Sequence, residues 1–235
     1  MGLMRPRSPS RRFCERVCVV GSGPAGLACA DVLNKAGYQV VVFENARQPG
    51  GILRYGIPDF KLEKWIVDRR VKLMEEEKIR FETSVEIGPD ISHRYLKSRF
   101  DAIALTGGAR EPRDLKVPGR ELQGIHFAMD FLIQQNMRNG GETVEAERSI
   151  DASGRSVLVI GGGDTGSDCI GTALRQGARG VCQFEILPEP PPTRSDKTPW
   201  PLWPLQRRES SSHEEGGERR WSVMTKSFEG DEEGH

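Results

Sequence analysis

Residues 17–30, with the sequence Val-Cys-Val-Val-Gly-Ser-Gly-Pro-Ala-Gly-Leu-Ala-Cys-Ala, decide the fold of this chain. An apolar run ends in a glycine-rich turn and continues with helical spacing, which predicts a strand, a phosphate-binding loop and a helix. Gly21 suits the tight turn, Gly23 lets the backbone approach a pyrophosphate, and Gly26 lets the helix lie close on the strand. The start of the helix would then face the anion. The whole predicted loop comprises Gly21, Ser22, Gly23, Pro24, Ala25 and Gly26.

The residue after the second predicted strand makes this pattern more specific. Residues 40–43 are apolar, and Glu44 follows them directly. An acidic side chain about twenty residues beyond such a loop accepts hydrogen bonds from the hydroxyls of an adenosine ribose. A glycine-rich turn in an ordinary βαβ unit would explain the glycines but not Glu44. The sequence therefore predicts a dinucleotide-binding unit.

The same pattern begins again at residue 157. Apolar residues 157–160 lead into a second glycine-rich loop, then a helix that ends at Gly177 and a strand over 181–184. The loop comprises Gly161, Gly162, Gly163, Asp164, Thr165 and Gly166. A repeated strand, loop, helix and strand is far more specific than a single match. We expect an α/β fold with two Rossmann-like units, the second of which is cut short.

Composition excludes several other classes of function. The chain has 235 residues, with 34 basic and 34 acidic side chains, so its formal net charge of +0 gives no field suited to nucleic acid or an anionic membrane. No apolar run approaches the roughly 20 residues of a membrane helix, and no secretory signal follows the start. The five cysteines form no CxxC pair, and we expect no metal site. These features predict a cytoplasmic protein.

Two adjacent dinucleotide sites suit hydride transfer between a nicotinamide and a flavin, because the cofactors supply that chemistry. The step needs no protein acid, base or nucleophile, so we expect no catalytic side chain. The histidines are scattered through the chain and are interpreted as structural or solvent-exposed. They are His93, His126, His213 and His235.

The order of the motifs predicts four segments. Residues 1–15 mix Arg, Pro and Ser and are expected to form a disordered tail or linker. Residues 16–112 would form the FAD-binding domain, 113–153 a connecting segment, and 154–235 an incomplete NAD(P)H-binding domain. A further strand is expected at residues 221–224.

Several longer motifs resemble the small (beta) subunit of bacterial NADPH-dependent glutamate synthase. They include both loops, Gly-Gly-Ile-Leu-Arg-Tyr-Gly-Ile-Pro-Asp-Phe-Lys over residues 50–61, His-Phe-Ala-Met-Asp-Phe-Leu over 126–132, and the tryptophan-rich region 200–203. The resemblance runs from about residue 17 onward. It implies a fold like that of the pyridine nucleotide-disulfide oxidoreductases.

The resemblance also implies cofactors, partners and a role. In that family NADPH reduces FAD, and electrons pass through iron-sulfur clusters to FMN in a large (alpha) subunit that forms glutamate. Residues 161–166 would hold NADPH. The residues that would line FAD, besides the first loop, are Glu44, Gly50, Gly51, Ile52, Leu53, Lys61, Val85 and Gly107.

The chain departs from the family at both ends. Members begin with a cysteine-rich domain that helps to hold the clusters, and they finish with a segment that completes the FAD site. We therefore expect an internal fragment without cluster ligands. Two alternatives stay open: a related flavoprotein that passes electrons to ferredoxin or resembles the electron-input half of dihydropyrimidine dehydrogenase, and an inactive interaction fragment.

The local residues leave the choice of nicotinamide cofactor open. Glu185 follows the second strand of the second unit, where an acid usually selects the free ribose hydroxyl of NAD. NADP sites usually offer an arginine there, and Arg194 is a candidate partner for the 2′-phosphate. The resemblance favours NADPH.

Overall fold

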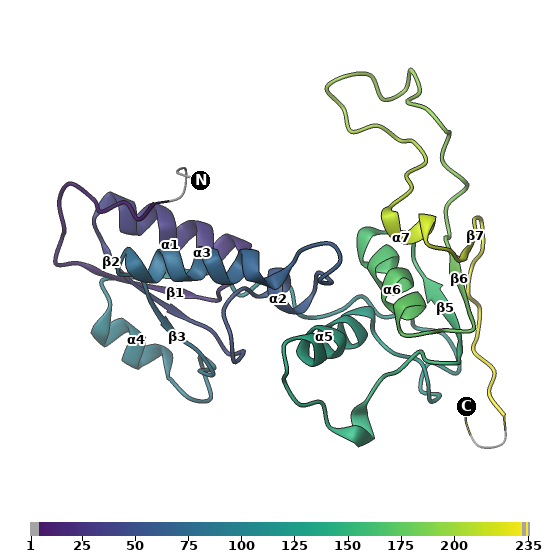
Figure 1. Ribbon diagram of the computed structural model, residues 1–235, viewed down its shortest axis with the longest axis horizontal. Coiled ribbons are helices and arrows are strands. Elements are labelled where there is room, and N and C mark those ends of the chain that lie inside the picture. Colours follow the sequence, from purple (N-terminus) through teal and green to yellow (C-terminus); the bar gives the residue numbers. More distant parts are fainter. Residues whose placement is uncertain (1–4, 232–233, 235) are drawn as a thin grey trace. The chain divides into compact units, whose positions relative to one another are not determined.

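The computed structural model describes residues 5–231 and Gly234. The chain divides into two compact units, Met1–Pro112 and Arg113–His235. Each unit contains its own parallel sheet, and the fold is the α/β arrangement that the sequence predicts (Figure 1).

The sheet of the first unit has four parallel strands in the order β3-β2-β1-β4. The strand β1 (Arg16–Val20) lies between β2 (Gln39–Phe43) and β4 (Ala102–Leu105), and β3 (Arg80–Glu82) lies at the edge. Val17 is in register with Val40 on one side and with Ala102 on the other. Short apolar strands of this kind are typical of parallel sheets that are covered on both faces.

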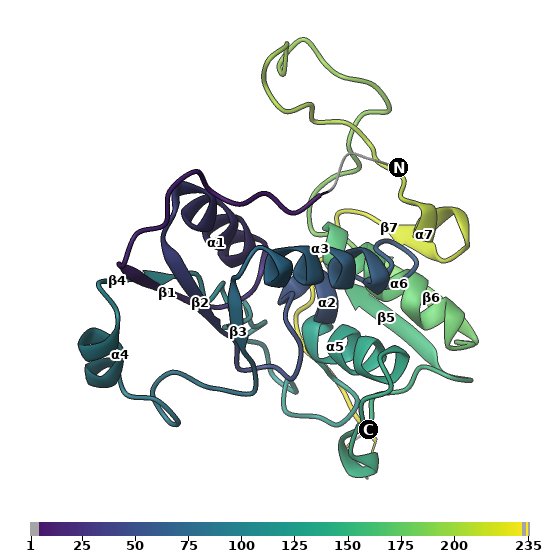
Figure 2. The same cartoon turned by 60° about the vertical axis from the view of Figure 1, so that its left-hand side comes forward.

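Helices cover the two faces of this sheet. The helices α1 (Pro24–Ala36) and α3 (Lys64–Glu76) pack on one face, and α4 (His93–Arg99) packs on the other (Figure 2). Alternating strand residues supply the two cores, because successive side chains of a strand point to opposite faces. The first core holds Val19, Leu27, Ala30, Val40, Val42, Val67, Val71, Met74 and Ile79, and the second holds Cys18, Val41, Phe43, Leu96 and Phe100.

Some boundaries differ from the sequence pattern. The pattern predicts a helix from Lys61, but α3 begins at Lys64 because Lys61 and Leu62 donate their N–H groups to the carbonyl of Pro58 in a turn. A single turn of helix, α2 (Ile52–Tyr55), precedes it. The alternating pattern of residues 79–83 predicts a strand, but β3 is shorter because the N–H of Ile79 caps the end of α3 by donating to the carbonyl of Met74.

The sequence pattern predicts a disordered tail over residues 1–15; the structure describes residues 5–15 as a mostly exposed segment without helix or strand that hydrogen-bonds to the first unit, and residues 1–4 lie outside the described part of the chain. Arg12 donates from Nη1 to Oδ1 of Asn34 at 2.6 Å and from Nη2 to the carbonyl of Glu77 at 2.8 Å. The N–H of Phe13 donates to the carbonyl of Gly37 at 2.9 Å. These hydrogen bonds attach the segment to the ends of α1 and α3, which a composition-based expectation of disorder does not take into account.

The second unit has a three-stranded parallel sheet in the order β5-β6-β7. Its strands are β5 (Ser156–Ile160), β6 (Gly180–Phe184) and β7 (Glu218–Arg220). The last of these replaces the strand expected at 221–224. The helix α6 (Asp164–Arg175) packs on the sheet beside α5 (Ala128–Asn139) (Figure 1).

Residues 113–153 contribute to the core of this unit in addition to forming a connection. The core holds Phe131, Leu132, Ala152, Cys169, Ile170, Ala173 and Val181. A 3₁₀ helix, η1 (Ala146–Arg148), follows α5, and a short helix, α7 (Ser211–Glu214), precedes β7. Between β6 and α7 runs a long loop that carries the exposed side chains of Trp200 and Trp203.

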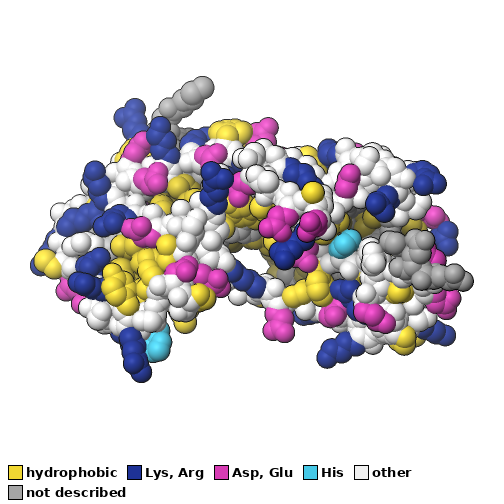
Figure 3. All heavy atoms as spheres, turned by 90° about the horizontal axis from the view of Figure 1, so that it is seen from below, with side chains coloured by type: hydrophobic (Ala, Val, Ile, Leu, Met, Phe, Trp, Pro, Cys, Tyr) yellow, Lys and Arg dark blue, Asp and Glu magenta, His cyan; other side chains and the backbone are white. Residues whose placement is uncertain are grey.

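Basic and acidic side chains are interspersed over the face of the molecule that Figure 3 shows, in agreement with the balanced net charge. Within the described residues, every helix is too short or too polar to cross a membrane.

Candidate functional site

The first glycine-rich loop joins β1 to α1 at the carboxyl end of the sheet. Gly21 has φ +99°, and its N–H donates to the carbonyl of Phe43 at 2.8 Å. A Cβ at Gly26 would lie 1.9 Å from the carbonyl oxygen of Gly21, so helix and strand approach each other as only glycine allows. A Cβ at Gly23 would meet nothing within 4 Å. The loop is therefore tightly packed at its ends and open at its centre.

A second pair of glycines lies directly against this loop. A Cβ at Gly51 would lie 2.7 Å from Cα of Gly23, and the N–H of Gly50 donates to Oγ of Ser22 at 2.9 Å. The short helix α2 starts here with Ile52 and Leu53. The structure thus brings residues 50–53 to the loop, although they lie far from it in sequence.

Glu44 lies at the end of β2 and is buried, with 4% of its surface exposed. Its Oε2 accepts hydrogen bonds from the N–H and the hydroxyl of Ser22 at 2.9 and 2.6 Å, and its Oε1 accepts one from the N–H of Ala46 at 2.9 Å. An ionised carboxylate has about four acceptor sites, so Glu44 keeps some capacity for a ribose hydroxyl. Residue type alone does not reveal the role of Ser22 in fixing this carboxylate.

The other residues predicted around the first loop have different environments. The hydroxyl of Thr106 donates to the carbonyls of Val20 and Gly21, and this places the open backbone of Gly107 beside the loop. Val85 is half-buried, and its N–H donates to the carbonyl of Glu44 at 3.0 Å. Lys61 is exposed, with Nζ 5.9 Å from the ring centroid of Phe60.

The second loop follows the same plan between β5 and α6. Gly161 has φ +120°, and its N–H donates to the carbonyl of Phe184 at 2.9 Å. A Cβ at Gly166 would lie 2.5 Å from the carbonyl oxygen of Gly161, whereas one at Gly163 would meet nothing within 4 Å. Asp164 and Thr165 are exposed in the first turn of α6.

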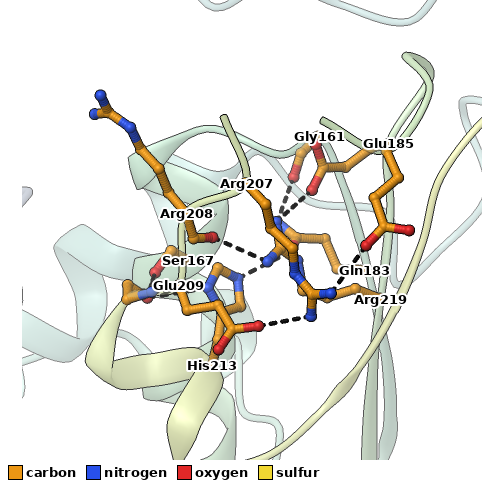
Figure 4. Close-up of polar contacts among 11 residues, drawn as sticks. Gly161, Ser167, Gln183, Glu185, Arg207, Arg208, Glu209, His213 and Arg219 are labelled. Atoms are coloured by element: carbon orange, nitrogen blue, oxygen red, sulfur yellow. Dashed lines mark hydrogen bonds and ion pairs between the residues drawn. The ribbon is translucent and has the colours of Figure 1, made fainter. Parts of the chain in front are cut away.

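A buried polar network supports this second loop (Figure 4). Gln183 is fully buried and donates from Nε2 to the carbonyl of Gly161 at 2.7 Å. Its Oε1 lies 3.1 Å from Nε2 of His213, whose Nδ1 lies 3.2 Å from the N–H of Ser210. Because Nδ1 accepts from Ser210, we assign the proton of the neutral imidazole to Nε2, which donates to Gln183. Ser210 also hydrogen-bonds through its hydroxyl to Ser167 on α6.

The acid at the end of β6 is paired with an arginine. Oε1 of Glu185 lies 2.8 Å from Nη2 of Arg219 on β7, and the two side chains are 15% and 12% exposed. Arg194 is exposed and donates to the carbonyls of Thr198 and Leu202 in its own loop at 3.1 and 3.2 Å. The structure therefore joins Arg219 to Glu185, whereas the sequence pattern indicates Arg194 as the candidate arginine. His235 lies outside the described residues.

The cysteines and a surface cavity are not part of the two glycine-rich loops. All five cysteines are free, and burial raises the pKa of Cys18 to about 11 and that of Cys169 to about 12. Groups of three or more side chains able to hold a metal ion do not occur among the described residues. An open cavity of about 320 Å³ is lined by Arg16, Gln39 and Arg80, which begin their strands, so it lies at the end of the sheet opposite the loop.

These two units, each with a glycine-rich loop and an acid after its second strand, define a class of nucleotide-dependent oxidoreductase. The chain belongs to the pyridine nucleotide-disulphide oxidoreductase family, whose model matches residues 15–198. A glutamate synthase [NADPH] small chain from Mycobacterium tuberculosis (strain ATCC 25618 / H37Rv) is 51% identical over 232 residues, which are 97% of this chain and 48% of that protein. The predicted resemblance is confirmed, and the chain spans about half the length of that relative.

Two further similarities bear on the nucleotide. A glutamate synthase [NADH] from Schizosaccharomyces pombe is 46% identical over 242 residues, which are 100% of this chain and 12% of that protein. The structure of FprA from Mycobacterium tuberculosis in complex with NADPH matches with a TM-score of 0.61 and 26% identity over 74% of this chain and 43% of that one.

Proposed function

We propose that the first unit binds FAD, that the second binds NADPH, and that the chain belongs to the electron-input (small) subunit of glutamate synthase. The observation that carries this proposal is the repeated plan of the two loops. Each loop is open at its central glycine, Gly23 or Gly163, directly before a helix. A relative that is 51% identical and is a glutamate synthase [NADPH] small chain supports the role.

The first loop fits a pyrophosphate. The open space at Gly23 faces the first turn of α1, where backbone N–H groups without helical partners favour an anion. Residues 21–26 would hold the pyrophosphate, and Glu44 would accept the ribose hydroxyls. Residues 50–53 and Gly107 border the same space, and Lys61 and Val85 complete the proposed set.

The second loop fits the other dinucleotide in the same way. Residues 161–166 would hold its pyrophosphate at the start of α6, with Gly163 leaving the backbone accessible. The buried Gln183 fixes the carbonyl of Gly161 and so sets the shape of the loop before a ligand arrives. A loop that is already ordered loses less conformational entropy on binding.

Hydride transfer from a nicotinamide to a flavin is the chemistry that the two cofactors supply when they are bound. The role of this chain would be to bind the two cofactors and to orient them. The large (alpha) subunit would be its partner in glutamate synthase. No iron-sulfur cluster is assigned to this stretch, because the described residues offer no set of ligands. NADH is the second candidate donor, and the relative from Schizosaccharomyces pombe and Glu185 favour it.

The test is the absorbance spectrum of the purified chain after incubation with FAD and removal of free flavin. We expect a bound-flavin spectrum that anaerobic NADPH bleaches. The variant Glu44→Gln should retain less flavin, while Glu86→Gln, at an exposed acid of the same unit, should match the parent chain. If neither flavin nor NADPH binds, the proposal is wrong; if NADPH binds without flavin, only the assignment of the first unit fails.

A further inference from the structure

The strand-end acids of the two units have different partners, although they occupy the same place in the same plan. Glu44 accepts hydrogen bonds from neutral donors, which are the N–H and hydroxyl of Ser22 and the N–H of Ala46. Glu185 instead binds the guanidinium of Arg219 at 2.8 Å. One unit therefore presents a carboxylate, and the other presents an ion pair.

This ion pair lies beside the second loop. A Cβ at Gly162 would fall 2.0 Å from Oε2 of Glu185, so the carboxylate occupies the space next to that glycine. In a Rossmann unit the acid at this position is the group that meets the 2′ position of the adenosine ribose. A guanidinium bound to the acid is therefore close to the atom that distinguishes NADPH from NADH.

The guanidinium of Arg219 is held in place, but not all of its hydrogen-bond donors have a partner (Figure 4). Its Nη1 donates to the carbonyl of Arg208 at 3.1 Å, and its Cζ lies 4.9 Å from the ring centroid of Trp221. Its Nε is buried and has no hydrogen-bond partner. A planar guanidinium fixed by a carboxylate and an aromatic face is well suited to bind a phosphate.

The other arginines near this site have different partners, and Cζ of Arg208 lies 3.9 Å from the ring centroid of Trp203. The neighbouring Arg207 is engaged by Glu189 and Glu209 at 2.9 and 2.6 Å. Arg194 is exposed and donates to carbonyls of its own loop. Without Arg219, the carboxylate of Glu185, whose side chain is 15% exposed, would repel a doubly charged phosphate.

We propose that Arg219 is the specificity-determining residue for NADPH, because its guanidinium neutralises Glu185 and donates to the 2′-phosphate. This inference rests on the proposed function of the second unit. It implies that the strand-end acid, which by itself favours NAD, is compatible with NADPH because β7 brings an arginine to it.

Binding of 2′,5′-ADP and 5′-AMP to the whole chain tests the proposal, since these probes carry the adenosine end of NADPH and NADH and need no flavin. Titration calorimetry gives both dissociation constants. We expect the parent chain to prefer 2′,5′-ADP and Arg219→Gln to weaken that probe by about tenfold, the effect of one lost charged interaction, with 5′-AMP changed less than about twofold. The matched control is Arg220→Gln, because Arg220 is exposed and its partner is Glu218.

Two more variants keep the test decisive if Arg219→Gln unfolds. Glu185→Gln should tighten the binding of 2′,5′-ADP by releasing Arg219, and the double variant Glu185→Gln with Arg219→Gln should bind both probes equally without leaving an unpaired charge at this site. An unchanged preference in the double variant, or a loss caused by Arg194→Gln alone, would overturn the proposal. A parent chain that binds neither probe would contradict the proposed function itself, whereas one that binds both equally would contradict only this inference.

Discussion

Gln183 donates a hydrogen bond from its buried Nε2 to the carbonyl oxygen of Gly161 at 2.7 Å and thereby fixes the first residue of the second loop from the adjacent strand. Oε1 of the same amide lies 3.1 Å from Nε2 of His213, so the long segment after β6 also helps to hold Gln183 in position against the loop.

Replacing this glutamine should destabilise the second unit. Gln183→Leu removes the partners of the Gly161 carbonyl and of the His213 Nε2–H, and a buried polar group left without a partner costs about 1–3 kcal/mol. Urea unfolding followed by circular dichroism measures the change. Gln123→Leu, at an exposed glutamine of the same unit, should change stability by less than about 0.5 kcal/mol. Equal effects of the two substitutions would argue against a structural role for Gln183.

Substitutions at two glycines of the first loop should distinguish an effect on stability from an effect on cofactor binding. Gly26→Ala should destabilise the chain by about 1–3 kcal/mol or more, because its Cβ would lie 1.9 Å from the carbonyl oxygen of Gly21. Gly23→Ala meets no atom within 4 Å, so we expect a loss within about 1 kcal/mol but weaker retention of FAD. Thermal unfolding and the flavin spectrum measure the two effects. Tight flavin binding by Gly23→Ala would show that the open space is not the pyrophosphate site.

Cysteine reactivity should follow burial. Because burial raises the pKa of Cys18 to about 11 and that of Cys169 to about 12, the thiolate fraction of Cys18 at pH 8 is on the order of one in a thousand. Iodoacetamide at pH 8 should therefore modify the exposed Cys14 and leave both buried thiols intact, as mass spectrometry of peptides would reveal. In denaturant all three should react, and Cys14→Ser should remove the fast reaction. Rapid modification of Cys169 in the folded chain would contradict its burial.

Much of the fold follows from local sequence. The two glycine-rich loops, the apolar strands around them and the helices between them have periodicities and turn residues that act over a few positions, and the structure has these elements near the predicted bounds. The α/β class with two Rossmann-like units is confirmed. The exact roles of the loop residues in binding stay predictions.

Contacts between distant residues could not be predicted in this way. Ser22 meets Glu44 across 22 positions, and Gln183 meets His213 across 30. Arg219 reaches Glu185 only because β7 pairs with β6, and the sequence pattern indicated that strand a few residues too late. Arg194 was the nearer arginine in sequence, but the path of its loop decides which carbonyls it meets. These contacts depend on which strands and loops come together in the tertiary structure, and local residue patterns do not specify that.

The central position of β1 has a consequence for how the first unit forms. One edge of β1 pairs with β2, which follows soon after it, but the other edge pairs with β4. The N–H of Arg16 hydrogen-bonds Asp101, 85 positions away. Closing so long a loop precedes the gain from pairing, which makes such sheets slow to fold. During synthesis from the N-terminus, one edge of β1 therefore remains an open template for wrong partners until β4 has left the ribosome.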